Sequence, residues 1–347
     1  MPYQLPQEPS TARRARVTGW VTFAFAAVLV ALVAYFAYVG YEGSRQFTEA
    51  PTPTGDCRTP ATFGWEYEAI NYDVAGDTAL ADEPNPTACN AFGATAGHKV
   101  TGPGEVGLAG WYVPAASGAS PDAPTVVLAH GWGTSKSAML DRAAILHDDY
   151  NLLLLDFRNH GQSEESQTTQ GVREARDLVA MLDWLEASKG PDRIAVQGSS
   201  MGGASALAAA VRDERVDALI VESTHATLAN AIQARLDVAG YPLSVPGSWA
   251  ILLGALMRTG EDASSVDPIQ AVARLDGRPL LLVCAGEDDS IGPTDAEDML
   301  AAAADAGANV ELHVCATAEH AASLAACPED YAGWVLGFLE RALADPG

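Results

Sequence analysis

Basic residues are scarce in this chain of 347 residues. It has 20 Lys and Arg against 45 Asp and Glu, which gives a formal net charge of −25. Because binding to nucleic-acid phosphates needs clustered basic side chains, this balance disfavours a nucleic-acid partner. Hydrophobic residues make up 48% of the chain, so it can bury a substantial core and is globular rather than disordered.

Cysteine is also rare, and no motif for a metal or a cofactor is present. There are five cysteines, with no Cys-x-x-Cys or Cys/His spacing of the kind that holds structural zinc. We therefore expect no metal site. In an oxidising compartment, Cys57–Cys89 and Cys315–Cys327 are one reasonable set of disulfides, with Cys284 left free inside a strand. The sequence alone does not fix this connectivity.

Charge is missing altogether from Val17 to Tyr41. This stretch of 25 residues (41 − 16) is long enough to cross a bilayer as a helix. Trp20 lies near one end, and tyrosines lie near the other, as interfacial anchors do. These tyrosines are Tyr35, Tyr38 and Tyr41.

The charges around this stretch predict its orientation. Arg13, Arg14 and Arg16 precede it, whereas Arg45 alone follows closely, so we expect the N-terminus in the cytoplasm and the rest outside the cell membrane. The alternative is a cleaved signal peptide. Its hydrophobic region is normally shorter, and no good small-residue cleavage site follows the stretch.

Strands and helices alternate from about residue 98. Most of the expected strands are uniformly apolar, which is typical of a parallel sheet covered by helices on both faces. The expected strands are 105–113, 125–129, 150–155, 193–197, 216–221, 279–285 and 309–315. The expected helices are 136–147, 172–185, 201–212, 295–306 and a last helix around 331–339.

The chain is therefore expected to have an α/β fold, with a mostly parallel, doubly wound sheet preceded by one transmembrane helix. Its expected parts are a cytoplasmic tail (1–16), a transmembrane anchor (17–41), an extracytoplasmic linker and prelude (42–97), and the α/β domain (98–347). Within that domain, residues 223–278 form an insert with two helical stretches, 226–239 and 246–257.

A Gly-x-Ser-x-Gly pattern joins one expected strand to the following helix, with Ser200 at its centre. A sharp turn at this joint would expose the serine, and small flanking residues would allow the close approach. The start of the helix would supply N–H groups for a developing oxyanion. The plainer alternative is a Gly/Ser-rich turn in which a serine caps the helix.

A nucleophilic serine needs a base and an acid that orients the base, in the chain order Ser, acid, His. His320 follows a strand and is the predicted base, whereas His313 lies within that strand and is expected to be structural. Asp289, three residues after Gly286, is the predicted acid, and the neighbouring Asp288 is the alternative.

Two further strand ends carry polar or glycine-rich motifs. The segment His130-Gly131-Trp132-Gly133 follows residues 125–129. We expect the backbone N–H groups of Trp132 and Met201 to form an oxyanion hole, and His130 to hold the loop. The segment 156–163 contains Asp156, Arg158 and His160, which we expect to form a buried hydrogen-bond network.

Taken together, these motifs resemble those of the α/β-hydrolase superfamily over residues 98 to 345. The matching motifs are HGWG, DFRNHGQS, GSSMG, GEDDSIGP and the Glu-His of the histidine loop. Asn159 replaces the family's usual glycine, and Gly292 replaces a frequent valine. The resemblance implies hydrolysis of esters, thioesters, amides or peptides without a cofactor. The chain looks most like membrane-anchored bacterial hydrolases similar to serine aminopeptidase-like and dienelactone-hydrolase-like proteins.

The insert at 223–278 stands where this family usually has a cap. Its most apolar segment is expected either to pack inside the cap or to form a lid that lines an acyl pocket or touches the membrane. That segment contains Trp249, Ile251, Leu252, Leu253, Leu256 and Met257.

The function expected from the sequence is a membrane-anchored serine hydrolase that cleaves a carboxylic ester through an acyl-enzyme on Ser200. Its substrate would be a small-molecule ester, a lipid or a short peptide. The alternatives are a peptidase or an acyltransferase with the same triad, or a non-catalytic binding protein on a hydrolase scaffold.

Overall fold

The fold was analysed in a computed structural model, which describes residues 11–49, 58–72, 106–116 and 123–344. Cys57 and Cys89 lie outside these residues, so their predicted disulfide does too. The predicted Cys315–Cys327 disulfide is present, with a Cα–Cα distance of 6.1 Å, and Cys284 is free and buried as expected.

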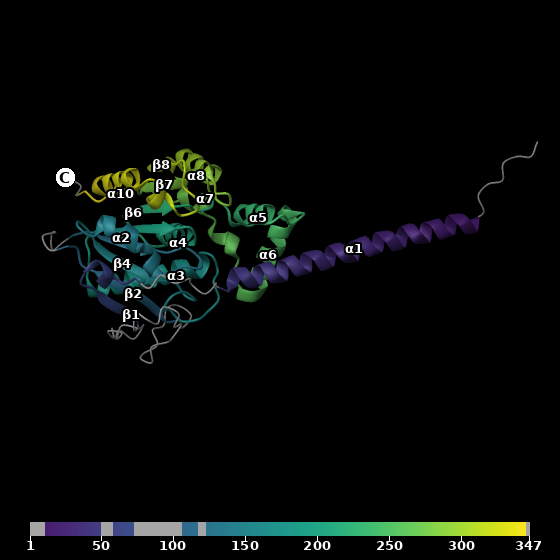
Figure 1. Cartoon of the computed structure of the whole chain (residues 1–347), viewed down its shortest axis with the longest axis horizontal. Coiled ribbons are helices and arrows are strands. Elements are labelled where there is room, and N and C mark those ends of the chain that lie inside the picture. The colour runs from purple at the N-terminus through teal and green to yellow at the C-terminus, as the bar shows by residue number, and fades with distance from the viewer. Residues whose placement is uncertain (1–10, 50–57, 73–105, 117–122, 345–347) are drawn as a thin grey trace, which may run out of the picture.

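An eight-stranded sheet forms the centre of the molecule, with the strand order β1-β2-β4-β3-β5-β6-β7-β8 (Figure 1). Strands β3 to β8 run parallel, and β1 and β2 add an antiparallel edge. The strands are β1 (Glu68–Tyr72), β2 (Leu108–Val113), β3 (Thr125–Ala129), β4 (Asn151–Asp156), β5 (Ile194–Ser199), β6 (Ala218–Glu222), β7 (Leu280–Ala285) and β8 (Val310–Cys315). The mostly parallel sheet predicted from the apolar runs is confirmed.

Helices cover both faces of this sheet, so the central strands are buried on both sides. Val126 and Leu128 of β3 pack with α2 (Leu140–Leu146) and α10 (Pro328–Ala342), whereas Val127 packs on the opposite face. That opposite face carries α3 (Val172–Ser188), α4 (Met201–Ala210), α7 (Pro268–Val272) and α8 (Pro293–Asp305). Burial on both faces explains why the sequence runs are apolar without alternation.

Four short elements complete the described part of the chain, and one of them divides the predicted helix at 136–147. A 3-10 turn, η2 (Lys136–Met139), precedes α2 there. The other short elements are η1 (Pro60–Phe63), η3 (Ala263–Val266) and α9 (Ser323–Ala326). Strand β1 was not predicted, because its sequence Glu-Ala-Ile-Asn-Tyr has weak alternation and lies at the edge of the sheet.

One long helix, α1 (Thr11–Thr48), projects from the globular domain (Figure 1). Its segment Val17–Thr48 is long and apolar enough to cross a membrane, with a mean hydropathy of 2.3 in its most apolar window. The helix does not end at Tyr41, so the prediction of a linker starting at residue 42 is wrong. Arg45 forms ion pairs with Glu42 and Glu49 at helical spacing, and these pairs support the extra turns.

The insert forms a small helical cap beside α1. It contains α5 (Leu228–Val238) and α6 (Ser244–Thr259), and α6 crosses α1 (Figure 1). A Cβ on Gly40 would lie 2.8 Å from the carbonyl oxygen of Ala250, so glycine is what lets the two helices touch here. The two predicted cap helices are therefore present, and the end of α1 packs against them.

Candidate active site

Ser200 lies on a sharp turn between β5 and α4. Its backbone has φ 53° and ψ −118°, a conformation that non-glycine residues rarely adopt. A Cβ on Gly198 would collide with the backbone of Gly202 and Gly203, and a Cβ on Gly202 with that of Ala129. The tight turn therefore requires both glycines, and it points the Ser200 side chain away from the sheet.

His320 contacts Ser200 from the loop that follows β8. Its Nε2 lies 3.0 Å from Ser200 Oγ, and its Nδ1 lies 2.6 Å from Asp288 Oδ2. The three side chains come from the carboxyl ends of β5, β7 and β8, where parallel α/β sheets usually bind ligands. They thus form a continuous chain from hydroxyl to imidazole to carboxylate.

The acid predicted from the sequence is not the one that contacts His320. Asp288 is only 7% exposed, whereas the predicted Asp289 is exposed to solvent. The turn after β7 folds back one residue earlier than the spacing suggested, because Asp288 Oδ1 accepts hydrogen bonds from the backbone N–H groups of Ser290 and Ile291. These bonds hold the carboxylate inward and direct the next side chain outward.

The surroundings of Asp288 keep its carboxylate ionised. Burial on its own would raise the pKa of this carboxyl group. The hydrogen bond and charge of His320, together with the N–H groups of Ile291 and Ser290, outweigh that effect and lower the pKa below its usual value. An ionised Asp288 can fix the tautomer of His320 and stabilise the imidazolium that forms when Ser200 loses its proton.

The two predicted oxyanion donors lie beside Ser200. Met201 begins α4, and the N–H groups of a first helical turn have no acceptor within the helix. A Cβ on Gly131 would be 3.4 Å from Ser200 Cβ, which places the loop that contains Trp132 against the nucleophile. An oxyanion hole formed by the Trp132 and Met201 N–H groups stays a prediction.

A buried hydrogen-bond network holds the Trp132 loop, as predicted. His130 Nε2 accepts from the Phe157 N–H at 3.1 Å, and His160 Nε2 accepts from the Gly133 N–H at 3.1 Å. Burial lowers the pKa of His130 to about 3, and the neighbouring His160 adds to the effect. His130 is therefore neutral, and its Nε2 can accept the hydrogen bond from Phe157. His130 therefore supports the loop and does not occupy the position of a second base.

Asp156 and Arg158, the two charged residues of this turn, do not pair with each other but with residues elsewhere in the chain. Asp156 accepts from Lys136 Nζ at 2.5 Å and from the Lys136 N–H at 2.7 Å, whereas Arg158 pairs with Asp177 at 2.6 Å. Asn159, which replaces the glycine usual in the resembling family, has φ 63°, a left-handed conformation that asparagine tolerates better than most residues. The substitution therefore leaves the turn intact.

A second buried network lies beneath the histidine loop and was not predicted. Glu222, at the end of β6, pairs with Arg142 at 2.6 Å and accepts from the Tyr331 hydroxyl at 3.0 Å. The same two charged residues also bind the backbone of the histidine loop. Arg142 donates to the Ala321 carbonyl, and Glu222 accepts from the Ser323 N–H. No local pattern links these residues, because 179 positions separate Arg142 from Ala321.

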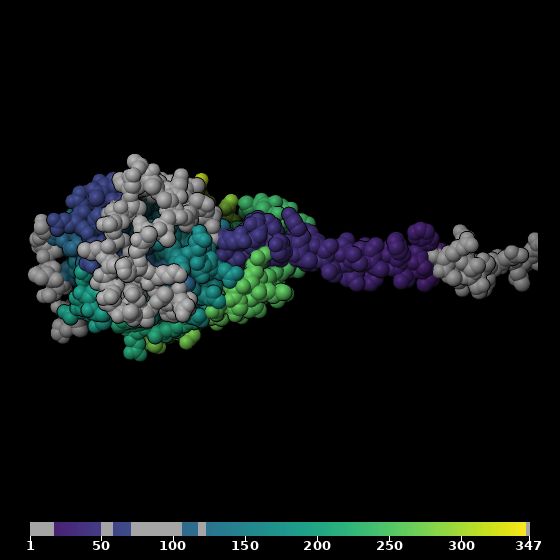
Figure 2. Space-filling view, turned by 90° about the horizontal axis from the view of Figure 1, so that it is seen from below, coloured from purple at the N-terminus to yellow at the C-terminus, as the bar shows by residue number. Residues whose placement is uncertain are grey.

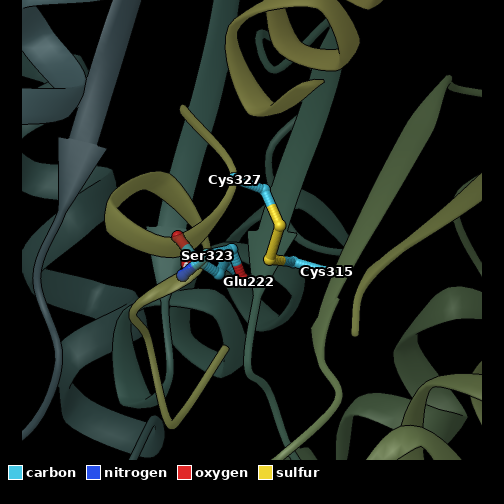
Figure 3. Close-up of a disulfide and its surroundings, with 4 residues drawn as sticks. All are labelled: Glu222, Cys315, Ser323 and Cys327. Carbon is cyan, nitrogen blue, oxygen red and sulfur yellow. Dashed lines mark hydrogen bonds between the residues drawn. A yellow bond between two sulfur atoms is a disulfide. The ribbon is translucent and has the colours of Figure 1, made fainter. Parts of the chain in front are cut away.

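The disulfide closes the same loop. Cys315 ends β8 and Cys327 precedes α10, so the bond spans the segment that carries His320 (Figure 3). Glu222 and Ser323 lie next to it in the same view. The histidine is therefore held from both sides, by a covalent link and by a buried ion pair.

Two other histidines complete the surroundings. His225 is buried after β6, and its pKa is lowered to about 4 by burial and, to a smaller extent, by the charges of Arg235 and His320. His313 stacks on Trp334 with ring centroids 4.9 Å apart, a structural role as predicted. In the described part of the chain, no three His, Cys, Asp or Glu side chains gather in a way that could hold a metal ion.

Comparison with known proteins agrees with this architecture. A family model described as the alpha/beta hydrolase fold matches residues 124–254. The protein Rv2307c of Mycobacterium tuberculosis is 31% identical over 201 residues, a match that covers 57% of this chain and 63% of that protein. The YqkD protein of Bacillus subtilis is 28% identical over 226 residues, which cover 62% of this chain and 71% of YqkD.

Solved structures show the same fold. The esterase Pf2001 of Pyrococcus furiosus superposes with a TM-score of 0.65 at 22% identity, covering 86% of this chain and 99% of the esterase. An acylaminoacyl peptidase of Pyrococcus horikoshii superposes with a TM-score of 0.53 at 20% identity, covering 68% of this chain and 39% of the peptidase. With the family match, these similarities show that the chain has the α/β-hydrolase fold.

Proposed function

We propose that this protein is a serine hydrolase that cleaves carboxylic esters at Ser200. The observation that carries the proposal is the chain of two contacts, 3.0 Å from Ser200 Oγ to His320 Nε2 and 2.6 Å from His320 Nδ1 to Asp288 Oδ2. The α/β-hydrolase fold and the structural similarity to the esterase Pf2001 support it. A binding protein would have no need to keep this geometry.

The reaction that follows from the geometry has two halves. Ser200 Oγ attacks the ester carbonyl as its proton passes to His320 Nε2, and the Trp132 and Met201 N–H groups stabilise the oxyanion. Collapse breaks the bond to the alcohol oxygen, which takes the proton from His320. Water then gives a proton to His320 and attacks the acyl-enzyme, which releases the acid and restores Ser200.

We also propose that α1 anchors this hydrolase in the cell membrane, with the N-terminus in the cytoplasm and the catalytic domain outside. Two features support this proposal. The most apolar part of α1 is wholly exposed, and arginines precede it in the sequence. The Cys315–Cys327 disulfide fits an oxidising compartment.

Labelling of the full-length protein in detergent with a fluorophosphonate tests the nucleophile. We expect wild type and Ser199→Ala to be labelled, and Ser200→Ala to lose labelling, since it is the Ser200 hydroxyl that lies 3.0 Å from His320 Nε2. Unlabelled protein from the same preparation would then be assayed on matched acetyl ester and acetyl amide substrates. Absence of labelling in a folded wild type would contradict the hydrolase proposal, and faster amide cleavage would favour a peptidase.

A further inference from the structure

A cleft of about 220 Å³ lies between α1 and the cap. Its walls are mostly apolar and come from distant parts of the sequence. They include Tyr38, Val39 and Phe47 of α1, Ile232 and Leu236 of α5, and Trp132. Apolar walls with a few polar groups are typical of sites that bind small amphiphilic molecules.

Trp132 links the cleft to the loop beside Ser200. This residue lines the cleft, and its backbone belongs to the loop that packs against Ser200. Arg235, which also lines the cleft, lies 6.0 Å from the centroid of the Trp132 ring. A molecule that fills the cleft therefore contacts Trp132, whose loop packs against Ser200.

The length of α1 places this cleft at the membrane surface. Residues 17 to 34 are all exposed, and Tyr35 is the first side chain to contact the cap, where its hydroxyl donates to the Pro242 carbonyl at 2.5 Å. Those 18 residues (34 − 16) span roughly 27 Å as a helix. This is close to the hydrocarbon thickness of a bilayer, about 30 Å, so the junction of α5 and α6 lies at the headgroup level.

Helix α6 presents an unpartnered apolar stripe beside that junction. Ile251 and Leu252 are buried in the cap, whereas the opposite face leaves large apolar side chains exposed at helical spacing. These are Val245 (52% exposed), Trp249 (57%), Leu253 (58%), Leu256 (40%) and Met257 (80%). Figure 2 shows α6, in green, alongside α1, in purple, where α1 meets the globular domain.

We propose that the cleft between α1 and the cap binds the acyl chain of a membrane-resident ester, while the exposed stripe of α6 rests on the bilayer. The inference rests on the proposed function of Ser200, because it names the substrate class of that site. The ester leaves the bilayer at the α5–α6 junction and presents its carbonyl to Ser200 past Trp132. An apolar stripe that begins beside the headgroup level is stabilised by the lipid interface.

Filling the cleft tests this proposal. Full-length protein in phosphatidylcholine vesicles would be assayed on 4-methylumbelliferyl decanoate and on the matched acetate. Ala239 lines the cleft and is exposed, so Ala239→Trp can fill the cleft without disturbing the core. We expect the ratio of decanoate to acetate turnover to fall at least about tenfold.

The control is Ala304→Trp, at an exposed alanine of α8 that does not line the cleft. It should leave the ratio of turnover unchanged. An unchanged ratio in Ala239→Trp, or an equal fall in both variants, would overturn the proposal.

A binding measurement separates this proposal from the hydrolase proposal. Ser200→Ala protein in vesicles would be photo-crosslinked to a lysophosphatidylcholine with a diazirine at the end of its acyl chain. We expect adducts on residues 232–239 that disappear when Ala239→Trp is added and persist with Ala304→Trp. Adducts on residues 17–34 alone would refute the acyl cleft, even if Ser200 is labelled. If wild type shows neither fluorophosphonate labelling nor turnover but the expected lipid adducts form, only the hydrolase proposal is refuted.

Discussion

The site at the carboxyl edge of the sheet and the cleft between α1 and the cap are built in different ways. Ser200, Asp288 and His320 are held by buried strands, backbone hydrogen bonds, an ion pair and a disulfide. The cleft is held by helix packing around Gly40 and Gly254 and by few polar contacts. The triad contacts are therefore held by buried and covalent links, whereas the proposed acyl cleft depends on the packing of a helix that we propose also enters the membrane.

The largest effect is expected when the carboxylate at the sheet edge loses its charge. Asp288→Asn should lower kcat by about 10⁴-fold, because an amide favours the wrong tautomer of His320. Asp289→Asn is the matched control and should stay within about twofold of wild type, since Asp289 is exposed. Steady-state ester kinetics on both folded variants checks this, and the opposite ranking would restore Asp289 as the acid.

A smaller effect is expected from the buried ion pair beneath the histidine loop. Glu222→Gln leaves Arg142 buried without its carboxylate, so the free energy of unfolding should fall by about 3–5 kcal/mol. Arg142→Met combined with Glu222→Leu removes both charges and should recover most of that stability. Denaturant unfolding measures both variants.

Kinetics of the same pair of variants tests positioning. The double variant should remain slower than wild type, with a shifted pH profile of kcat/KM, because Ala321 and Ser323 have lost their partners. If it regains both stability and the wild-type pH profile, the network only stabilises the fold.

A moderate effect of pH is expected from His225, which lies between the two regions. Burial lowers its pKa to about 4, whereas an unfolded histidine titrates near 6.5. Between these values only the unfolded chain binds the proton, so stability falls as pH decreases from 6.5 to 4, by up to about 1.4 kcal/mol per pH unit. His225→Asn should flatten this part of the stability curve in urea unfolding, and an unchanged slope would contradict the assignment.

The smallest effect on Ser200 reactivity is expected when the contact between α1 and the cap is broken. A Cβ on Gly254 would meet the Gly40 carbonyl and Ser44, so Gly254→Leu should push α6 off α1. We expect the decanoate-to-acetate ratio to fall several-fold, while the fluorophosphonate labelling rate stays within about twofold. Gly333→Leu, on open space in α10, is the control. A large loss of labelling would show that the two regions are not independent.

Most of the catalytic region was predictable because its motifs are local. Ser200 and His320 follow apolar strands, and the sheet edge brings strand ends together whatever the loop details. Asp288 was missed as the first choice because the choice between two adjacent carboxylates depends on where the turn folds back, which is decided by the N–H groups of Ser290 and Ile291. Arg142 and Glu222 were missed because their partners are far away in sequence.

The sequence by itself determined the order of strands and helices, the nucleophile turn and the apolar segment of α1, because each depends on neighbouring residues and on burial patterns of short period. Only the tertiary structure decided which carboxylate meets His320, how the histidine loop is supported, and that α1 continues to Thr48 against α6. Those features depend on contacts between residues about 30 to 210 positions apart, and no local pattern encodes such contacts.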